Sequence, residues 1–201
     1  MRFTLSLKNL SFALAMASFV SAGAASAQSL VGVNTRLVQP LDSRTATQGQ
    51  TVAVRLDGTL KTADGVKLPK GTELLGKVTD VKAAANGGPA SVSVLFSTAQ
   101  LKDGKQIPVK ATLLAAYPSS EGEQSLDADQ TIDTVANHVG PDHSVDQEPG
   151  ALPGVALTAA VQSANSGTFT KADGNFKLTA GTYLQMGVAP ATTSNSTSAA
   201  E

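Results

Sequence analysis

Short runs of alternating apolar and polar residues, separated by turn-forming dipeptides, constrain this chain to β-structure. In the clearest run, Thr51–Leu56, the residues Val52, Val54 and Leu56 share one face. Alternate residues of a strand point to opposite faces, so the run predicts a strand with one buried face. Asp-Gly dipeptides, which close hairpins, follow at positions 57–58, 64–65 and 103–104.

The stretch Val66–Val78 carries the most informative turn of the chain. Pro69 presets φ near about −65° for the first corner, and Gly71 accepts the positive φ that often follows. The sequence therefore predicts a strand end, a turn, and a second strand from Thr72 to Lys82. Gly76 interrupts that second strand and indicates a bulge or a tight bend, as small barrels need at their corners.

Further strands are expected at a similar spacing. Val92, Val94 and Phe96 are expected to point inward from a strand at Ser91–Phe96, whereas the lead-in from Leu30 to Gln50 shows only weak strand character around residues 36–38. Other strands are expected at 106–114, 154–161, 168–170, 176–178 and 182–188. Because no segment beyond the N-terminal leader has a helical period, the predicted fold is all-β. It is a single small β-barrel, or a barrel-like sandwich, with a long acidic loop insertion.

The first 27 residues have the organisation of a secretory signal peptide. Arg2 and Lys8 form a basic start, residues 10–20 form an apolar core, and Ala25-Ser26-Ala27 supplies the small residues that a signal peptidase needs. The apolar core is shorter than the ~20 residues that span a bilayer, so cleavage after Ala27 is expected rather than a retained anchor. The mature protein would be periplasmic or extracellular, with a β-barrel domain at 28–189 and a disordered tail at 190–201.

Composition excludes several classes of protein. The chain has no cysteine, so disulfides, thiol catalysis and thiolate metal sites are excluded. Removing Arg2 and Lys8 from the 15 basic residues leaves 13, against 16 acidic ones, which gives a net charge of −3. Without a Lys/Arg cluster, that balance argues against nucleic acid or anionic lipid as a partner. The few aromatic rings left after cleavage cannot form the two aromatic girdles of an outer-membrane barrel, so the mature chain is not expected to span a membrane.

Residues 117–150 differ in composition from the rest of the chain. No Lys or Arg lies between Ala111 and Thr170, and both histidines lie in this segment. It is too polar to form a core and too long for an ordinary connection, so it is expected to be a loop insertion. Its acidic residues are Glu121, Glu123, Asp127, Asp129, Asp133, Asp142, Asp146 and Glu148.

The two histidines raise the question of a metal site. His138, Asp142, His143 and Asp146 combine imidazole and carboxylate groups, which suit zinc or another divalent cation. On a helix, His138 and Asp142 would share one face, but Gly140-Pro141 breaks any helix there. The favoured interpretation is a solvated loop with two incidental histidines. No metal and no other cofactor is therefore predicted, and these four residues remain the alternative.

Other site motifs are incomplete or missing from the sequence. Asp127, Asp129 and Asp133 could donate oxygens to calcium, but the run lacks the glycine and the distal glutamate of an EF-hand loop. The chain contains no Gly-x-Ser-x-Gly, Ser-x-x-Lys or His-Glu-x-x-His motif and no phosphate-binding loop. No catalytic residue is predicted.

Three lysines surround the central turn. Lys67, Lys70 and Lys77 could form a small basic spot. The favoured interpretation is that they are solvated ends of edge strands, which use lysine to discourage pairing with other sheets.

The segments Thr59–Leu74 and Thr168–Leu184 resemble each other when one residue is inserted. They share Ala-Asp-Gly, Lys-Leu and Gly-Thr at matching places. One explanation is that two similar hairpins need similar turn residues. The other is a pseudo-symmetric barrel in which the two hairpins occupy related positions. Both explanations predict the same all-β architecture.

Three features together resemble a known family. They are the Leu-Pro-Lys-Gly-Thr turn at 68–72, the alternating strand Ser91–Phe96, and the run Leu-Lys-Asp-Gly-Lys-Gln-Ile-Pro-Val at 101–109. The pattern is similar to the C-terminal β-barrel of TrbI-like scaffold proteins of type IV secretion. The segment 180–188 looks like the last strand of that barrel. The resemblance implies a β-barrel in the bacterial cell envelope.

The chain also departs from that family. TrbI-like proteins carry an inner-membrane anchor where this chain has a cleavable signal, and a helical hairpin that crosses the outer membrane where this chain has the acidic segment 117–150. Gly140-Pro141 and Pro149-Gly150 interrupt that segment. The resemblance therefore implies a stand-alone exported relative rather than a working part of a secretion channel.

The function expected from the sequence is that of a non-enzymatic structural or protein-interaction module in the envelope, with a protein partner. One alternative is a metal-dependent hydrolase or metal-binding protein that uses His138 and His143. Another is a cell-wall carbohydrate-binding module, against which the scarcity of aromatic rings weighs.

Overall fold

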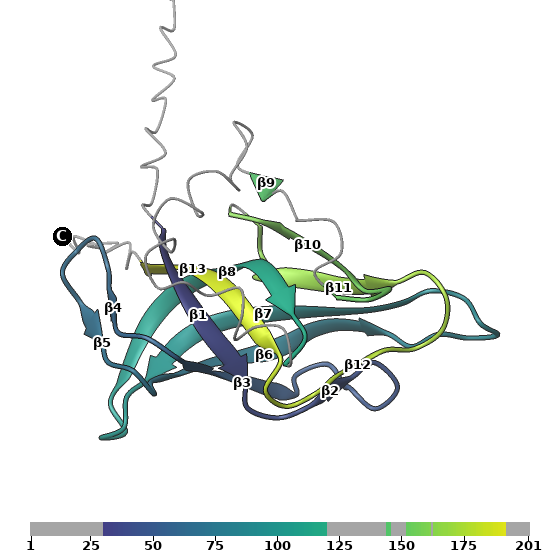
Figure 1. The fold of residues 1–201 in the computed structure, drawn as a ribbon, viewed down its shortest axis with the longest axis horizontal. Helices are drawn as coiled ribbons and strands as arrows, with labels where there is room; N and C mark the ends of the chain where they lie inside the picture. The colour runs from purple at the N-terminus through teal and green to yellow at the C-terminus, as the bar shows by residue number, and fades with distance from the viewer. Residues whose placement is uncertain (1–29, 120–143, 146–151, 162, 192–201) are drawn as a thin grey trace, which may run out of the picture.

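A computed structural model describes residues 30–119, 144–145, 152–161 and 163–191. The described chain consists of strands, turns and loops, which confirms the predicted all-β fold (Figure 1). Within these ranges no helix combines the length and the apolar character that a bilayer crossing requires. The predicted signal peptide at 1–27, most of the acidic segment and the tail from 192 onward lie outside the described residues.

The described residues form strands of two to twelve residues, and the three longest follow one another in the middle of the chain. They are β1 (Val31–Leu37), β2 (Leu41–Asp42), β3 (Thr51–Leu56), β4 (Leu60–Lys61), β5 (Lys67–Leu68), β6 (Glu73–Lys82), β7 (Ala90–Gln100), β8 (Gln106–Tyr117), β9 (Ser144–Val145), β10 (Ala156–Ala160), β11 (Gly167–Lys171), β12 (Lys177–Leu178) and β13 (Tyr183–Pro190).

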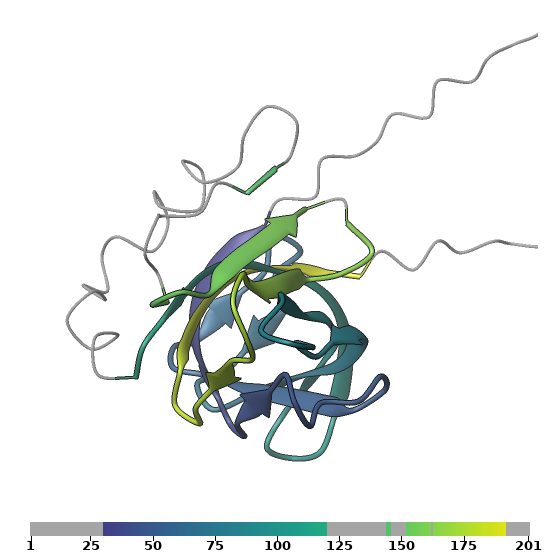
Figure 2. The same cartoon turned by 90° about the vertical axis from the view of Figure 1, so that its right-hand side faces the viewer.

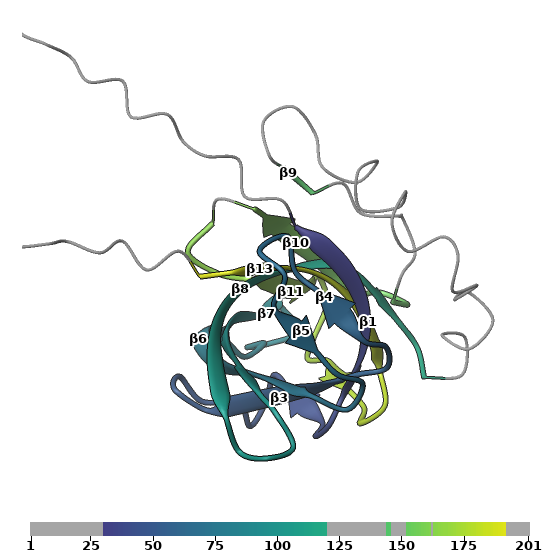
Figure 3. The same cartoon turned by 90° about the vertical axis from the view of Figure 1, so that its left-hand side faces the viewer.

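Six of these strands close into an antiparallel barrel. In ring order they are β6, β3, β1, β13, β8 and β7, and β7 pairs again with β6 to complete the ring. Figure 3 shows the ring end-on. Strand β11 pairs with the first half of β7, and β10 and β9 continue that sheet outward. The pairs β4–β5 and β2–β12 form two separate short sheets.

The apolar faces of the strands fill the barrel interior. Val92, Val94 and Phe96 of β7 are at most 1% exposed, as their alternation predicts, and they pack in one cluster with Leu113 and Met186. Side chains can fill the interior of a barrel of this size, and their burial, at about 25 cal/mol per Å², is the main favourable term in folding. The interior is therefore a hydrophobic core. Polar groups that a ligand could reach lie on the outer face and at the ends.

The bulge predicted at Gly76 is confirmed. The register between β6 and β7 shifts between Leu75 and Gly76. A Cβ atom at Gly76 would lie 2.7 Å from the carbonyl oxygen of Leu95 and 2.7 Å from Cδ1 of Phe96. Glycine is required here because the neighbouring strand and the Phe96 ring approach the backbone too closely for any side chain.

The lead-in forms a longer strand than the weak strand character predicted around residues 36–38. Residues 31–37 form β1, a strand of seven residues that lies inside the ring between β3 and β13. Thr35 is completely buried on the inward face, and its hydroxyl donates a hydrogen bond of 2.8 Å to the Leu184 carbonyl oxygen. A polar residue at a buried position hides the alternation that identified the other strands.

A smaller apolar cluster lies on the outside of the barrel. Leu114 of β8 and Val161 are buried against each other, with Leu30 and Ala159 packed around them. The β10–β11 extension therefore lies over the outer face of the barrel (Figures 1 and 2).

The first of the two similar segments forms a turn between β5 and β6. Gly71 has φ +86°, and its N–H donates to the Leu56 carbonyl oxygen at 2.9 Å. The Leu56 N–H donates in return to the Thr72 carbonyl oxygen at 2.9 Å, and the Thr72 N–H donates to the Pro69 carbonyl oxygen. The turn is thereby tied to the end of β3.

The second segment makes the same set of bonds between β12 and β13. Gly181 has φ +84°, and its N–H donates to the Leu37 carbonyl oxygen at 2.8 Å. The Leu37 N–H donates to the Thr182 carbonyl oxygen at 2.9 Å, and the Thr182 N–H donates to the Thr179 carbonyl oxygen. The two turns are therefore structural equivalents, each tied to a different strand of the barrel.

The remainder of the similarity does not correspond to two hairpins. In the first copy β5 pairs with β4, through Leu60 and Leu68. In the second copy β12 pairs with β2, through Leu41 and Leu178, while β11 pairs with β7 and β10. The equivalent of β4 is thus β2, which precedes β12 by most of the chain. The turns support the pseudo-symmetric explanation, and the expectation of a second hairpin is wrong.

Candidate functional site

A row of side chains winds around the outer face of the barrel. Residues directly opposite each other on paired strands point to the same side of a sheet. The pairings join seven residues in this way, across all six strands of the ring. In order they are Tyr117, Tyr183, Arg36, Arg55, Glu73, Gln100 and Gln106.

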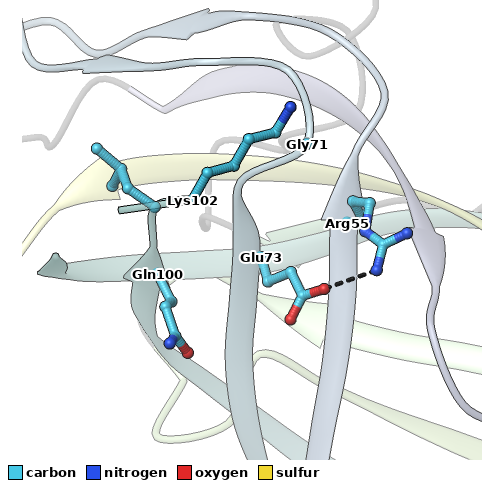
Figure 4. A pocket seen from close by; sticks show the side chains of 6 residues that line it. Arg55, Gly71, Glu73, Gln100 and Lys102 are labelled. Atoms are coloured by element: carbon cyan, nitrogen blue, oxygen red, sulfur yellow. Dashed lines mark hydrogen bonds and ion pairs between the residues drawn. The ribbon is translucent and has the colours of Figure 1, made fainter. Parts of the chain in front are cut away.

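The centre of this row is an ion pair between β3 and β6. Arg55 and Glu73 are direct partners in the ladder, and Arg55 Nη2 lies 2.8 Å from Glu73 Oε1 (Figure 4). The side chains are 55% and 32% exposed, so the pair contributes at most about 1 kcal/mol to stability. Its main effect is to hold both charged groups in a fixed position beside Gln100.

A lysine from a distant turn lies over the glycine of the central turn. A Cβ atom at Gly71 would lie 2.8 Å from Cε of Lys102 and 3.2 Å from its Nζ. Lys102 belongs to the tight turn between β7 and β8, which is closed by the bond from the Leu101 N–H to the Lys105 carbonyl oxygen. Only a glycine at position 71 leaves room for the lysine side chain where it lies (Figure 4).

These residues border an open groove of about 440 Å³. Small-molecule pockets have comparable volumes but are enclosed and largely apolar, whereas this groove is shallow, polar and open to solvent. It is lined by Arg55, Gly71, Glu73, Gln100, Leu101 and Lys102.

Four of the lysines at this end of the barrel form what we call the lysine patch: Lys61, Lys67, Lys70 and Lys102. Lys61 and Lys67 are directly opposite each other in the β4–β5 ladder. Lys70 lies in the turn that follows β5, next to Gly71. All four side chains are exposed, and none forms an ion pair with another described residue.

At the other end of the row an arginine covers a buried tyrosine. The Arg36 guanidinium lies 4.2 Å from the centroid of the Tyr183 ring, which is only 2% exposed, and Arg36 Nε lies 2.7 Å from Asp57 Oδ2. The Tyr183 hydroxyl has no hydrogen-bond partner among the described residues. The ring is thus held by packing and by the cation above it, and it is not available to stack on a ligand.

The groove suits recognition rather than bond-making chemistry. Its charged groups are one ion pair and one lysine, and its neutral polar group is the Gln100 amide. Within the described ranges no three His, Cys, Asp or Glu side chains are arranged to hold a metal ion. A set of this kind can bind an anion through Lys102 and donate hydrogen bonds through Gln100.

The candidate metal residues lie elsewhere in the chain. His138, Asp142, His143 and Asp146, like the aspartates at 127, 129 and 133, fall outside the described residues. The interpretation of Lys77 as an edge-strand lysine is wrong, because β6 pairs with β3 on one side and β7 on the other. Lys67 lies on β5, whose single ladder partner is β4, so its edge position agrees with the prediction.

Sequence patterns did not single out Arg55, Gln100 or Lys102. They reach the groove from β3, the end of β7 and the β7–β8 turn, which the pairing of β3 with β6, β6 with β7 and β7 with β8 places side by side. No protein-family model matches the chain, and no curated protein is found similar to it.

Proposed function

We propose that this protein is a non-catalytic interaction module of the cell envelope, which contacts a protein partner through the groove and the lysine patch at one end of its barrel. The observation that carries the proposal is that apolar side chains fill the barrel interior, whereas charged side chains gather at one end of the barrel. The interior is a hydrophobic cluster of side chains, whereas the groove combines the Arg55–Glu73 ion pair with an exposed lysine.

Rigid support of the groove favours a binding role. Arg55, Glu73 and Gln100 lie on strands of the closed ring, and the turn that carries Gly71 is fixed to β3 by two backbone hydrogen bonds. Binding groups on strands keep their positions better than groups on loops. A surface of this kind presents the same set of charges to every partner it meets.

Carbohydrate binding receives less support from the described residues. Phe96, Phe169, Phe176 and Tyr183 are all buried, and Tyr117 is the remaining ring of the part of the chain that the structure describes. Exposed aromatic platforms for sugars are therefore scarce there. The signal-like residues 1–27 support an envelope location, and the likeness to TrbI-like barrels fits the same compartment. Both remain part of the proposal.

Site-specific photo-crosslinking in the native cell tests this function. A photoreactive residue at Lys102 is expected to give one defined crosslinked species in the envelope fraction. The same residue at Lys82, which is exposed near the far end of β6, serves as the matched control and is expected to give none. Equal products at both positions, or none at either, would overturn the interaction role. Recovery of the protein from the cytosol with residues 1–27 intact would overturn the envelope location.

A further inference from the structure

The near-neutral charge of the whole chain conceals a basic barrel. Of the 16 acidic residues, the eight between positions 121 and 148 and Glu201 lie outside the described residues, which leaves seven. Of the 15 basic residues, only Arg2 and Lys8 lie outside, which leaves 13. The described barrel therefore carries a net charge of +6, and a surface of this sign attracts anionic partners.

The lysine patch is where this charge is least compensated. Of the acidic side chains at this end, Asp57 pairs with Arg36, and Glu73 pairs with Arg55. The Asp103 carboxylate accepts the N–H of Lys105 within its own turn. Asp64, in the β4–β5 turn, is the remaining carboxylate at this end. Among the described residues, the four lysines of the patch and Lys105 thus face two carboxylates that form no ion pair, Asp64 and Asp103.

Two of the lysines are held in an unfavourable arrangement. The Thr62 N–H donates to the Val66 carbonyl oxygen, so Thr62 and Val66 form a hydrogen-bonded pair in the β4–β5 ladder. Hydrogen-bonded and non-hydrogen-bonded residue pairs alternate along an antiparallel ladder, so the neighbouring pair, Lys61 and Lys67, is not hydrogen-bonded. The side chains of such a pair lie closer together than those of a hydrogen-bonded pair. Like charges directly opposite each other destabilise a sheet, and an anion placed between them would remove that cost.

The same alternation exposes main-chain groups at the free edge of β5. In a non-hydrogen-bonded pair the N–H and C=O groups point away from the ladder partner. Strand β5 has β4 as its one partner among the described strands, so the Lys67 N–H and C=O face outward. An extended peptide can pair with such an edge, whereas a phosphate polymer offers no backbone amides.

We propose that the lysine patch binds an extended acidic polypeptide, which adds to the free edge of β5 and places its carboxylates against Lys61, Lys67, Lys70 and Lys102. This proposal rests on the proposed interaction function and names the chemistry of the partner. Residues of a strand alternate between faces, so the ligand has acidic side chains at every second position.

Titration of the full mature chain with synthetic probes tests this inference. The probes are a peptide with glutamate at every second position, a peptide of the same charge with proline at the intervening positions, and inorganic polyphosphate. The alternating peptide is expected to bind most tightly and to weaken as salt is added. The proline peptide is expected to bind more weakly because it lacks the N–H groups that pair with β5.

Two double variants locate the binding. Lys61→Gln with Lys67→Gln is expected to weaken binding of the alternating peptide by about tenfold, which corresponds to the loss of two ion pairs, and to raise the urea midpoint because the repulsion is gone. Lys77→Gln with Lys82→Gln removes the same amount of charge from β6, outside the lysine patch, and is the matched control. It is expected to change binding by less than about twofold.

Three results would overturn the inference. The first is that the alternating peptide does not bind, and the second is that both double variants lose the same amount of affinity for it. The third is that polyphosphate binds as tightly as the alternating peptide and depends equally on Lys61 and Lys67. A specific crosslink at Lys102 together with any of these would leave the interaction function standing and reject only the acidic polypeptide.

Discussion

Arg36 and Arg55 lie directly opposite each other where β1 pairs with β3. Like charges in this position repel, and each guanidinium is matched by its own carboxylate. Arg36 Nε lies 2.7 Å from Asp57 Oδ2, and Arg55 Nη2 lies 2.8 Å from Glu73 Oε1. The two ion pairs therefore reduce the repulsion between the arginines that the pairing of β1 with β3 brings together.

Removal of either carboxylate is expected to destabilise the barrel slightly. Asp57→Asn and Glu73→Gln should each lower the free energy of unfolding by about 0.5–1 kcal/mol, as for other exposed pairs. The double variant should lose more than the sum, because the carboxylate that remains in each single variant still reduces the repulsion between the two arginines. Urea unfolding at low and high salt measures the effect, which salt should reduce.

Asp80→Asn is the control, because Asp80 is exposed and forms no ion pair with a described residue. Strictly additive losses would contradict the coupling.

The bulge at Gly76 is expected to reject any side chain. Gly76→Ala places a Cβ atom 2.7 Å from the Leu95 carbonyl oxygen and from the Phe96 ring, so the free energy of unfolding should fall by about 1–3 kcal/mol. Gly58→Ala is the matched control, because a Cβ atom there meets nothing within 4 Å, and its effect should stay within about 0.5 kcal/mol. Thermal or urea unfolding distinguishes the two. A Gly76 variant as stable as the Gly58 variant would show that β6 and β7 can separate at the bulge without cost.

The two equivalent turns are expected to accept each other's residues. Pro69→Thr with Lys70→Ala gives the first turn the residues of the second, and Thr179→Pro with Ala180→Lys does the reverse. Each exchange should change the free energy of unfolding by less than about 1 kcal/mol, because both turns make the same backbone hydrogen bonds. Unfolding of one exchanged protein, with the other unaffected, would contradict the equivalence.

The glycines of the same two turns should not be exchangeable for alanine. Gly71→Ala and Gly181→Ala force a side chain into the left-handed region at φ +86° and +84°, at a cost of about 1–2 kcal/mol each. The cost should be similar in the two turns and somewhat larger at position 71, where Lys102 has to move. Chemical denaturation of the two single variants provides the comparison. A marked cost at one position alone would show that the turns relax differently.

Loss of the Tyr183 hydroxyl is expected to stabilise the protein. Its oxygen is buried without a hydrogen-bond partner among the described residues, and an unpaired buried hydroxyl costs free energy. Tyr183→Phe should therefore raise the free energy of unfolding by up to about 1 kcal/mol. Tyr183→Leu should lower it instead, because the ring and its contact with Arg36 are lost. Calorimetry measures whether each variant raises or lowers the free energy of unfolding. A destabilised Phe variant would show that the hydroxyl has a partner in solution.

Local patterns predicted the fold where a strand follows the simple alternation rule. Val92, Val94 and Phe96 are buried as expected, and Gly76 marks a bulge. The rule failed at β1, because Thr35 occupies an inward position and satisfies its hydroxyl by bonding to Leu184. That bond depends on a strand from the far end of the chain, and no local pattern contains it.

The groove could not be predicted for a related reason. Arg55 and Glu73 become partners through the β3–β6 register, and Lys102 reaches Gly71 from a separate turn. These contacts depend on the register between paired strands, which brings together residues far apart in the sequence. Lys77 lies on a strand that is paired on both sides, which no local pattern around it indicates.

The barrel cannot close before β1 pairs with β13. Val31 of the first described strand meets Val188 of the last, so a chain emerging lengthwise from a ribosome or a pore has no complete ring until its final strand arrives. Contacts between such distant segments also form slowly. A copy cut short before β13 therefore leaves β1 and β8 without the strand that joins them.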